Sequence, residues 1–176
     1  MKWLNEDFRN LRALYVNQLR VLLDAEEQIV RAMPNMVVRA TDPQLRGAFQ
    51  SHLQETEEHI KRLEQILVDE RRVDPAVDAT SPIKCHPISA LVNEAEDFVT
   101  DTRDAWVRDA SLILAAQRIE HYEIASYGAL RQWAILMGRS TEADLLDRTI
   151  KEEGHADHLL TSIAERVNPQ ARRAAA

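Results

Sequence analysis

Glutamate residues stand inside the apolar stripe of a predicted helix in this 176-residue chain. The segment QRIEHYEIASYGAL, residues 117–130, places Glu120 and Glu123 three residues apart among apolar side chains. Because a helix advances about 100° per residue, the apolar stripe defines an inward face. Glu123 lies near the centre of this face and Glu120 lies on its flank. The segment therefore predicts a carboxylate inside the fold, with a second one beside it.

Polar groups also fall on the inward faces of three other predicted helices. Glu26 lies within about 30° of the centre of its apolar stripe, and Glu153 lies close to the centre of the stripe in the last helix. In the second helix the stripe centre holds His52, with His59 nearby. Two further acids lie on the flanks of these stripes: Glu55 and Asp157.

Acids that converge on one interior need a counter-charge, because an isolated buried carboxylate costs several kcal/mol. A pair of divalent metal ions supplies it, and Glu and His are suitable ligands for iron, manganese or zinc. In di-iron carboxylate bundles two helices each give one Glu and the other two each give a Glu-x-x-His. The alternative is that arginines such as Arg62, Arg108 or Arg118 reach inward and neutralise the acids.

One apparent ligand motif is out of register with the apolar stripe. Glu152-x-x-His155 has the metal-binding spacing, yet both residues are predicted on the solvated face of the last helix. His121, between the two acids of the opening segment, also points outward. The second helix reads His52-x-x-Glu55, the reverse of the usual order. The periodicity therefore favours a metal site that the short motif does not confirm.

The elements that carry these residues are helices, and no strand pattern competes with them. We predict an all-α, ferritin-like four-helix bundle of two helical hairpins joined by one long crossover, plus a short extra helix. Asn5 is the expected first N-cap, Pro34 ends or kinks the first helix, and Asp42 caps the second. The predicted elements are a helix over 4–33, a second helix from 43, a crossover over 69–87, a short helix over 88–99, a third long helix over 104–137, and a fourth from 140 that ends before 168.

The chain length suits a single domain, predicted over 1–168 with a disordered tail over 169–176. The net charge of −7 and the pI near 5.4 argue against nucleic acid or an anionic membrane as a partner. No apolar run is long enough to span a membrane, and MKWLNEDFRN lacks the apolar core of a signal peptide. The single cysteine, Cys85, excludes an intrachain disulfide, so we expect a cytoplasmic protein.

Three segments, LLDAEEQI, SHLQETEEHIKRLEQI and AAQRIEHYEIASYGAL, resemble the YciF-like stress-protein family, the DUF892 group of the ferritin-like superfamily. The resemblance runs from about residue 8 to 167. It implies a ferritin-like bundle, a homodimer, a dinuclear metal site and a role in stress responses. Val21 and Val37, at the outer edges of the first two helices, are our candidates for the dimer seam.

The resemblance implies that residues of this chain at matching positions bind the metal ions. His59 stands where some relatives have Gln, so we leave it out of the predicted set. Iron is the expected metal, with manganese or zinc as alternatives. The predicted metal-binding residues are Glu26, His52, Glu55, Glu120, Glu123, Glu153 and Asp157.

Two functions follow from these patterns. The first is a dinuclear metal protein with redox activity, such as a ferroxidase or a peroxidase acting on Fe(II) or peroxide. The second is a non-enzymatic helical stress or interaction protein, in which any metal is purely structural. The catalytic residues of the first function are not identifiable from the sequence.

Overall fold

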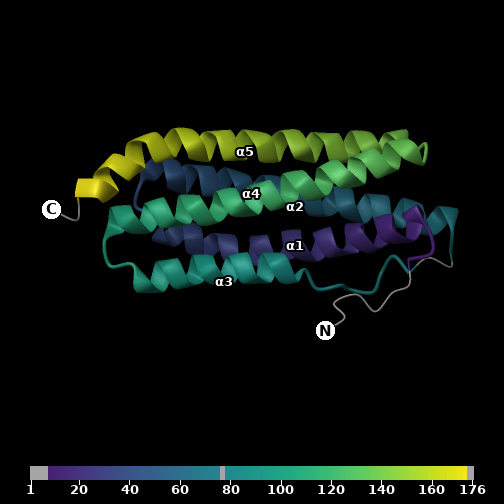
Figure 1. Ribbon diagram of the computed structural model, residues 1–176, viewed down its shortest axis with the longest axis horizontal. Coiled ribbons are helices and arrows are strands. Elements are labelled where there is room, and N and C mark those ends of the chain that lie inside the picture. The colour runs from purple at the N-terminus through teal and green to yellow at the C-terminus, as the bar shows by residue number, and fades with distance from the viewer. Residues whose placement is uncertain (1–7, 76–77, 174–176) are drawn as a thin grey trace.

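The structure is a computed structural model that describes residues 8–75 and 78–173. Within these ranges the chain forms five α-helices and no strand (Figure 1), which confirms the predicted all-helical fold. The helices are α1 (Leu11–Arg39), α2 (Pro43–Val73), α3 (His86–Asp101), α4 (Ala105–Leu136) and α5 (Ser140–Arg173).

Two helical hairpins make the bundle. Helix α1 packs on α2 and α4 packs on α5, while the hairpins meet through contacts of α1 with α4 and of α2 with α5. Helix α3 belongs to the crossover and packs against α1 and α4 from outside the four long helices (Figure 1). The predicted bundle with one long crossover and a short extra helix is therefore confirmed.

The first helix begins later than predicted and continues past Pro34 to Arg39. The Asn10 side chain caps it, accepting a hydrogen bond from Ala13 N at 2.8 Å. The predicted cap, Asn5, lies outside the described residues. Pro34 stands inside α1, so of the two alternatives the continuing helix is the correct one. Its exposed position lets the bundle tolerate the missing backbone hydrogen bond.

The ends predicted for three other helices were wrong because tertiary contacts extend them. Helix α2 continues to Val73, since Glu70 in its last turn is fully buried and accepts a hydrogen bond from Arg12 Nε at 2.6 Å. Helix α3 is two residues longer than 88–99 at each end. Helix α5 runs through Pro169 to Arg173, anchored just before by the buried Val167. Figure 1 shows α5 bending toward this end.

The turn between α1 and α2 is held by buried carboxylates. Asp109 of α4 is fully buried and accepts hydrogen bonds from Thr41 N at 2.9 Å and Asp42 N at 2.7 Å. Asp42 in turn caps α2 and accepts a hydrogen bond from Arg166 Nη2 of α5 at 2.7 Å. This end of the bundle is therefore tied together by side chains from α2, α4 and α5.

Apolar side chains line the inside of the bundle, from Tyr15 and Leu19 near one end to Ile163 and Val167 near the other. Charged groups cover much of the outside of the helices. In the described ranges no helix is both long and apolar enough to cross a membrane.

Asp109→Ala should destabilise the fold. The substitution leaves two backbone N–H groups without an acceptor, and each unsatisfied buried donor costs about 1–3 kcal/mol. We expect the free energy of unfolding, measured by urea denaturation, to fall by about 3 kcal/mol. Asp97→Ala, which removes an exposed carboxylate of α3, should change it by less than about 0.5 kcal/mol. Equal losses in the two variants would contradict the capping role.

Candidate metal centre

Six acidic and imidazole side chains converge in the middle of the bundle, which we call the mid-bundle cluster. One comes from α1, two from α2, two from α4 and one from α5. All six are buried, the most exposed being His52 at 6%. The members of the mid-bundle cluster are Glu26, His52, His59, Glu120, Glu123 and Glu153.

The mid-bundle cluster contains two overlapping groups of candidate metal ligands. Glu26, His59 and Glu153 form one group, and Glu153 also belongs to a second group. In each group the nearest ligand atoms all lie within 4.8 Å of one another. The shared residue is Glu153, so a carboxylate stands where it could bridge two ions. The second group consists of His52, Glu120, Glu123 and Glu153.

The two histidines face the carboxylates directly. His52 Nε2 lies 3.3 Å from Glu120 Oε1 and 3.7 Å from Glu153 Oε2. His59 Nδ1 lies 3.0 Å from the other oxygen of Glu153 and 3.5 Å from Glu26 Oε1. None of these nitrogen atoms has a hydrogen bond of good geometry. Each histidine thus presents one ring nitrogen to the centre of the cluster.

Arginine does not neutralise these acids. In the described part of the chain, every ion pair of the mid-bundle glutamates is with a histidine. The three arginines proposed from the sequence bind elsewhere. Arg62 pairs with Glu152, Arg108 donates to the Arg39 carbonyl at 3.2 Å, and Arg118 pairs with Glu94 of α3. The alternative of buried arginine counter-charges is therefore wrong.

Buried acids outside the mid-bundle cluster provide an internal comparison. Glu70 is fully buried, and its two oxygens lie 2.6 Å from Arg12 Nε and 3.0 Å from Arg139 Nη2. Glu142 accepts a hydrogen bond from Tyr15 Oη at 2.8 Å. Among the described residues, Glu70 thus has two arginine partners, whereas no arginine or lysine pairs with the acids at the centre of the bundle.

The environment of the mid-bundle acids disfavours their charged form. Burial, together with the negative charges of Glu26, Glu153 and Glu120, raises the pKa of Glu123 well above its ordinary value. Burial and the neighbouring Glu153 raise the pKa of Glu120, although His52 acts in the opposite direction. Burial likewise raises the pKa of Glu153 against the opposing effect of His59. A bound cation would remove this cost by favouring the carboxylates.

His59 is oriented from outside the cluster. Burial tends to lower its pKa, but the nearby carboxylates of Glu153 and Glu26 raise the pKa to about 11. Its Nε2 lies 2.9 Å from Glu152 Oε2, and Arg62 Nη2 donates to the other oxygen of Glu152 at 3.0 Å. Such a carboxylate partner on the far nitrogen fixes the ring orientation of a metal-binding histidine.

Tyr127 is the hydroxyl that enters the cluster. It is almost fully buried and donates a hydrogen bond to Glu26 Oε1. Burial and the charges of Glu26 and Glu123 raise the pKa of its hydroxyl, so the tyrosine stays protonated and acts as a donor. The other oxygen of this carboxylate, Glu26 Oε2, has no hydrogen-bond partner.

The structure brings five of the seven predicted site residues into the mid-bundle cluster. The sixth, Glu55, lies at its edge: its side chain is 36% exposed and 3.5 Å from His52 Nδ1. The seventh, Asp157, lies outside, where it accepts a hydrogen bond from Gln117 Nε2 at 3.1 Å and sits 3.3 Å from His121. The five predicted residues within the cluster are Glu26, His52, Glu120, Glu123 and Glu153.

The structure adds two residues to the predicted site. His59 is fully buried in the cluster although the prediction left it out. A signal existed, because His52 and His59 are seven residues apart and therefore lie within about 20° on one helix face. Glu152 was predicted on the solvated face, yet it is partly buried and bonds His59. His121 and His155 are exposed, as expected.

The comparisons with known proteins agree with this architecture. Residues 10–173 match the family model described as "Domain of unknown function (DUF892)". The chain belongs to the DUF892 family. The resemblance seen in the sequence is thus confirmed over nearly the whole chain.

Two relatives cover almost the same length. Protein YciF of Escherichia coli (strain K12) is 34% identical over 158 residues, which span 90% of this chain and 92% of YciF. The crystal structure of the E. coli stress protein YciF has a TM-score of 0.84 at 33% identity, covering 92% of this chain and 99% of that one. The structure of YcfI from Rhodopseudomonas palustris has a TM-score of 0.81 at 33% identity, covering 90% and 97%.

Glu123→Gln should stabilise the metal-free protein. Because folding raises the pKa of Glu123, the folded state loses stability as the pH rises past the ordinary glutamate value of 4.5, and the loss is present at pH 7. The neutral amide removes this loss, so we expect a higher melting temperature than wild type at pH 7 and a smaller difference at pH 4. Thermal unfolding after treatment with chelator measures both.

Glu70→Gln is the matched control for this prediction. It also replaces a fully buried glutamate of the DUF892 bundle, but one paired with Arg12 and Arg139. We expect it to lower the free energy of unfolding by about 2 kcal/mol at pH 7, because the two partly exposed arginines lose their negatively charged partner. A Glu123→Gln protein that is as destabilised as Glu70→Gln would contradict the interpretation of unpaired acids.

Proposed function

We propose that this protein binds two transition-metal ions in the mid-bundle cluster. Iron is the favoured metal, with manganese or zinc as alternatives. Glu26 and His59 would hold one ion, and Glu153 would be shared between the two. The residues for the second ion would be His52, Glu120 and Glu123. With four carboxylates and two imidazoles, the donor set equals that of di-iron carboxylate bundles. Its distribution differs, since both histidines come from α2.

The observation that carries the proposal is the set of buried polar atoms without partners. Among the described residues, ten buried side-chain nitrogen or oxygen atoms have no hydrogen bond, and all but Glu70 Oε1 belong to the mid-bundle cluster. Native proteins leave few such atoms, and each requires an explanation. Their concentration in one place, on residue types that bind metals, supports a metal pair as that explanation.

The charges of such a pair would balance. Four carboxylates carry four negative charges, and two divalent cations carry four positive ones, with the histidines bound as neutral imidazoles. Glu152, clamped by Arg62, would keep the His59 ring in place, and Tyr127 would hold Glu26 by its hydrogen bond. The apolar shell around the cluster keeps bulk water away from the carboxylates.

The chemistry we propose is redox chemistry in a stress response. An iron pair supplies two electrons, one from each ion, which together with two protons is what reduction of peroxide to water requires. The E. coli relative carries the description of a stress protein, and this supports the same setting here. The cytoplasmic location remains a prediction that rests on the single cysteine.

Metal content tests the binding proposal. Protein produced without a metal-affinity tag and loaded anaerobically with Fe(II) should hold about two ions per chain by elemental analysis, as expected for this donor set. Glu153→Ala should lose both ions, because Glu153 belongs to both ligand groups. Glu142→Ala, a matched buried glutamate outside the cluster, should retain them.

A folded wild-type protein that takes up no Fe(II), Mn(II) or Zn(II) would refute the metal site. Redox activity is measured separately, as the disappearance of peroxide added to the Fe(II)-loaded protein. A loaded protein that leaves peroxide unchanged would refute the redox part and favour the rival function, a structural metal in a helical interaction protein.

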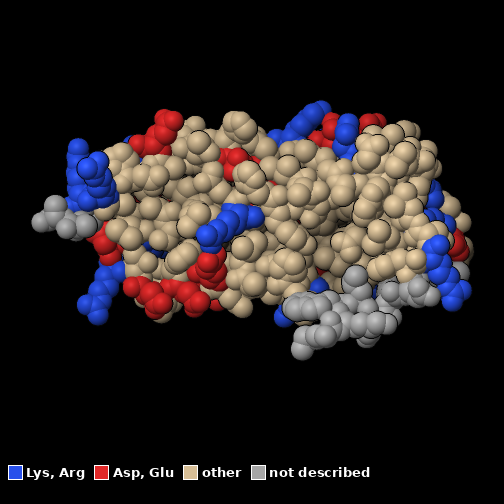
Figure 2. All heavy atoms as spheres, viewed as in Figure 1, with Lys and Arg blue, Asp and Glu red and all other residues tan. Residues whose placement is uncertain are grey.

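We also propose a homodimer that pairs through α1 and α4. A groove of about 320 Å³ runs between these helices beyond the region that α3 covers, and Leu22, Tyr122 and Trp133 line it. Figure 2 shows few charged atoms over the corresponding half of this face. An uncharged groove of this kind suits a second copy of the chain. The seam predicted at Val21 is not supported, since Val21 is buried within the chain.

Ala129→Arg should disrupt this dimer. Ala129 is exposed and lines the groove, so an arginine there places a charge in the proposed interface. We expect light scattering after size-exclusion chromatography to give the mass of a dimer for wild type and of a monomer for the variant. Ala90→Arg, at an exposed position of α3, should stay dimeric. A monomeric wild type, or a dimeric Ala129→Arg, would refute this interface.

A further inference from the structure

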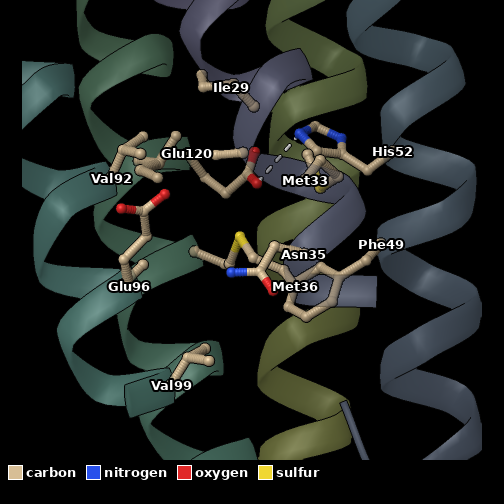
Figure 3. A pocket seen from close by; sticks show the side chains of 14 residues that line it. Ile29, Met33, Asn35, Met36, Phe49, His52, Val92, Glu96, Val99 and Glu120 are labelled. Carbon is tan, nitrogen blue, oxygen red and sulfur yellow. Dashed lines mark ion pairs between the residues drawn. The ribbon is translucent and has the colours of Figure 1, made fainter. Parts of the chain in front are cut away.

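A narrow pocket connects the mid-bundle cluster with the surface between α1 and α3. Figure 3 shows Glu120 of α4 reaching toward His52 of α2 at the inner end of this pocket. At the other end the exposed side chains of Asn35 and Glu96 mark the mouth. We call this pocket the apolar passage. Its walls include Ile29, Met33, Met36, Phe49, Val92 and Val99.

The apolar passage has room for one small molecule. The space open to the centres of water-sized molecules is about 20 Å³, and about 10–15 Å³ of such space is needed to hold one water. Its walls between mouth and inner end are aliphatic, aromatic and thioether groups. Met33 and Met36 are unbranched and flexible, so they can move aside as a molecule passes.

The chemistry of the passage selects against ions. A charged species would leave its hydration shell at the mouth and find no polar partner until it reached His52 and Glu120. A small uncharged molecule does not have this desolvation cost.

A second opening reaches the same two residues from the other side. It lies between α2 and α5 and contains Ser51, Glu55 and His155 besides His52 and Glu120. Carboxylate and imidazole groups at its entrance suit a cation. The mid-bundle cluster is thus approached by a second route, which has a carboxylate and an imidazole at its entrance as well as apolar side chains such as Phe49, and both routes end at His52 and Glu120.

We propose that the apolar passage admits dioxygen, or an uncharged molecule of that size, to the His52–Glu120 side of the metal pair. The inference rests on the proposed metal function and adds the class of its second reactant and the position that it reaches. Helix α3 then does more than connect the two hairpins, since its residues Val92, Ala95 and Val99 form the outer wall of the passage.

Filling the passage tests the proposal. Val92→Phe places a ring at its outer wall, while Leu91→Phe makes the neighbouring substitution at a half-buried residue of α3 that does not line it. Crystals of metal-free protein under xenon pressure should show xenon in the passage for wild type and Leu91→Phe, and none for Val92→Phe. Apolar cavities bind xenon without any metal, so this readout is independent of activity.

Oxidation of the Fe(II)-loaded protein gives the second readout. A bound Fe(II) pair would supply two electrons, and one dioxygen with these electrons and two protons would give hydrogen peroxide. We expect stopped-flow absorbance to show this oxidation slowed several-fold in Val92→Phe and unchanged in Leu91→Phe, with equal iron content in both. Ala95→Val narrows the same passage and should give the same result if Val92→Phe does not fold.

Three results would overturn the inference. These are the absence of xenon from the wild-type passage, oxidation at the wild-type rate in a Val92→Phe protein that excludes xenon, and a Val92→Phe protein whose defect lies in uptake of Fe(II). The last would make the passage the route of the metal. Failure of the proposed metal function is seen separately, as wild-type protein that binds no metal while xenon still occupies the passage.

Discussion

Four buried carboxylates lie together in the middle of the bundle, and among the described residues no arginine or lysine forms an ion pair with them. Like charges at such distances in a medium of low dielectric repel strongly. The two histidines of α2 approach the acids from one side, two turns apart, and Tyr127 donates to Glu26 from α4. These contacts reduce the repulsion without satisfying the ligand atoms, which remain directed at one another.

At the ends of the bundle, by contrast, buried acids are paired with arginines. Glu70 is held by Arg12 and Arg139 at one end, and Asp42 is held by Arg166 at the other. These clamps join helices that are distant in sequence. The uncompensated acids at the centre lower the stability of the fold, as functional sites commonly do.

The crossover gives the bundle two different sides. Helix α3 covers half of the face formed by α1 and α4, closing the apolar passage, and leaves the other half open over the groove near Trp133. A four-helix bundle with short loops would lack this asymmetry. In our proposals the long connection thus shapes both the route to the cluster and the face on which a second copy packs.

Local signals in the sequence determined the helices and the inward direction of Glu26, Glu123 and Glu153, because helical periodicity and caps such as Asp42 depend only on neighbouring residues. Only the tertiary structure decided the rest. Glu120 enters the cluster and Asp157 stays out of it, since positions on the flank of a stripe are assigned by the packing of other helices. His59 and Glu152 meet across α2 and α5 for the same reason: a contact between helices depends on their relative rotation and offset, which no single helix encodes.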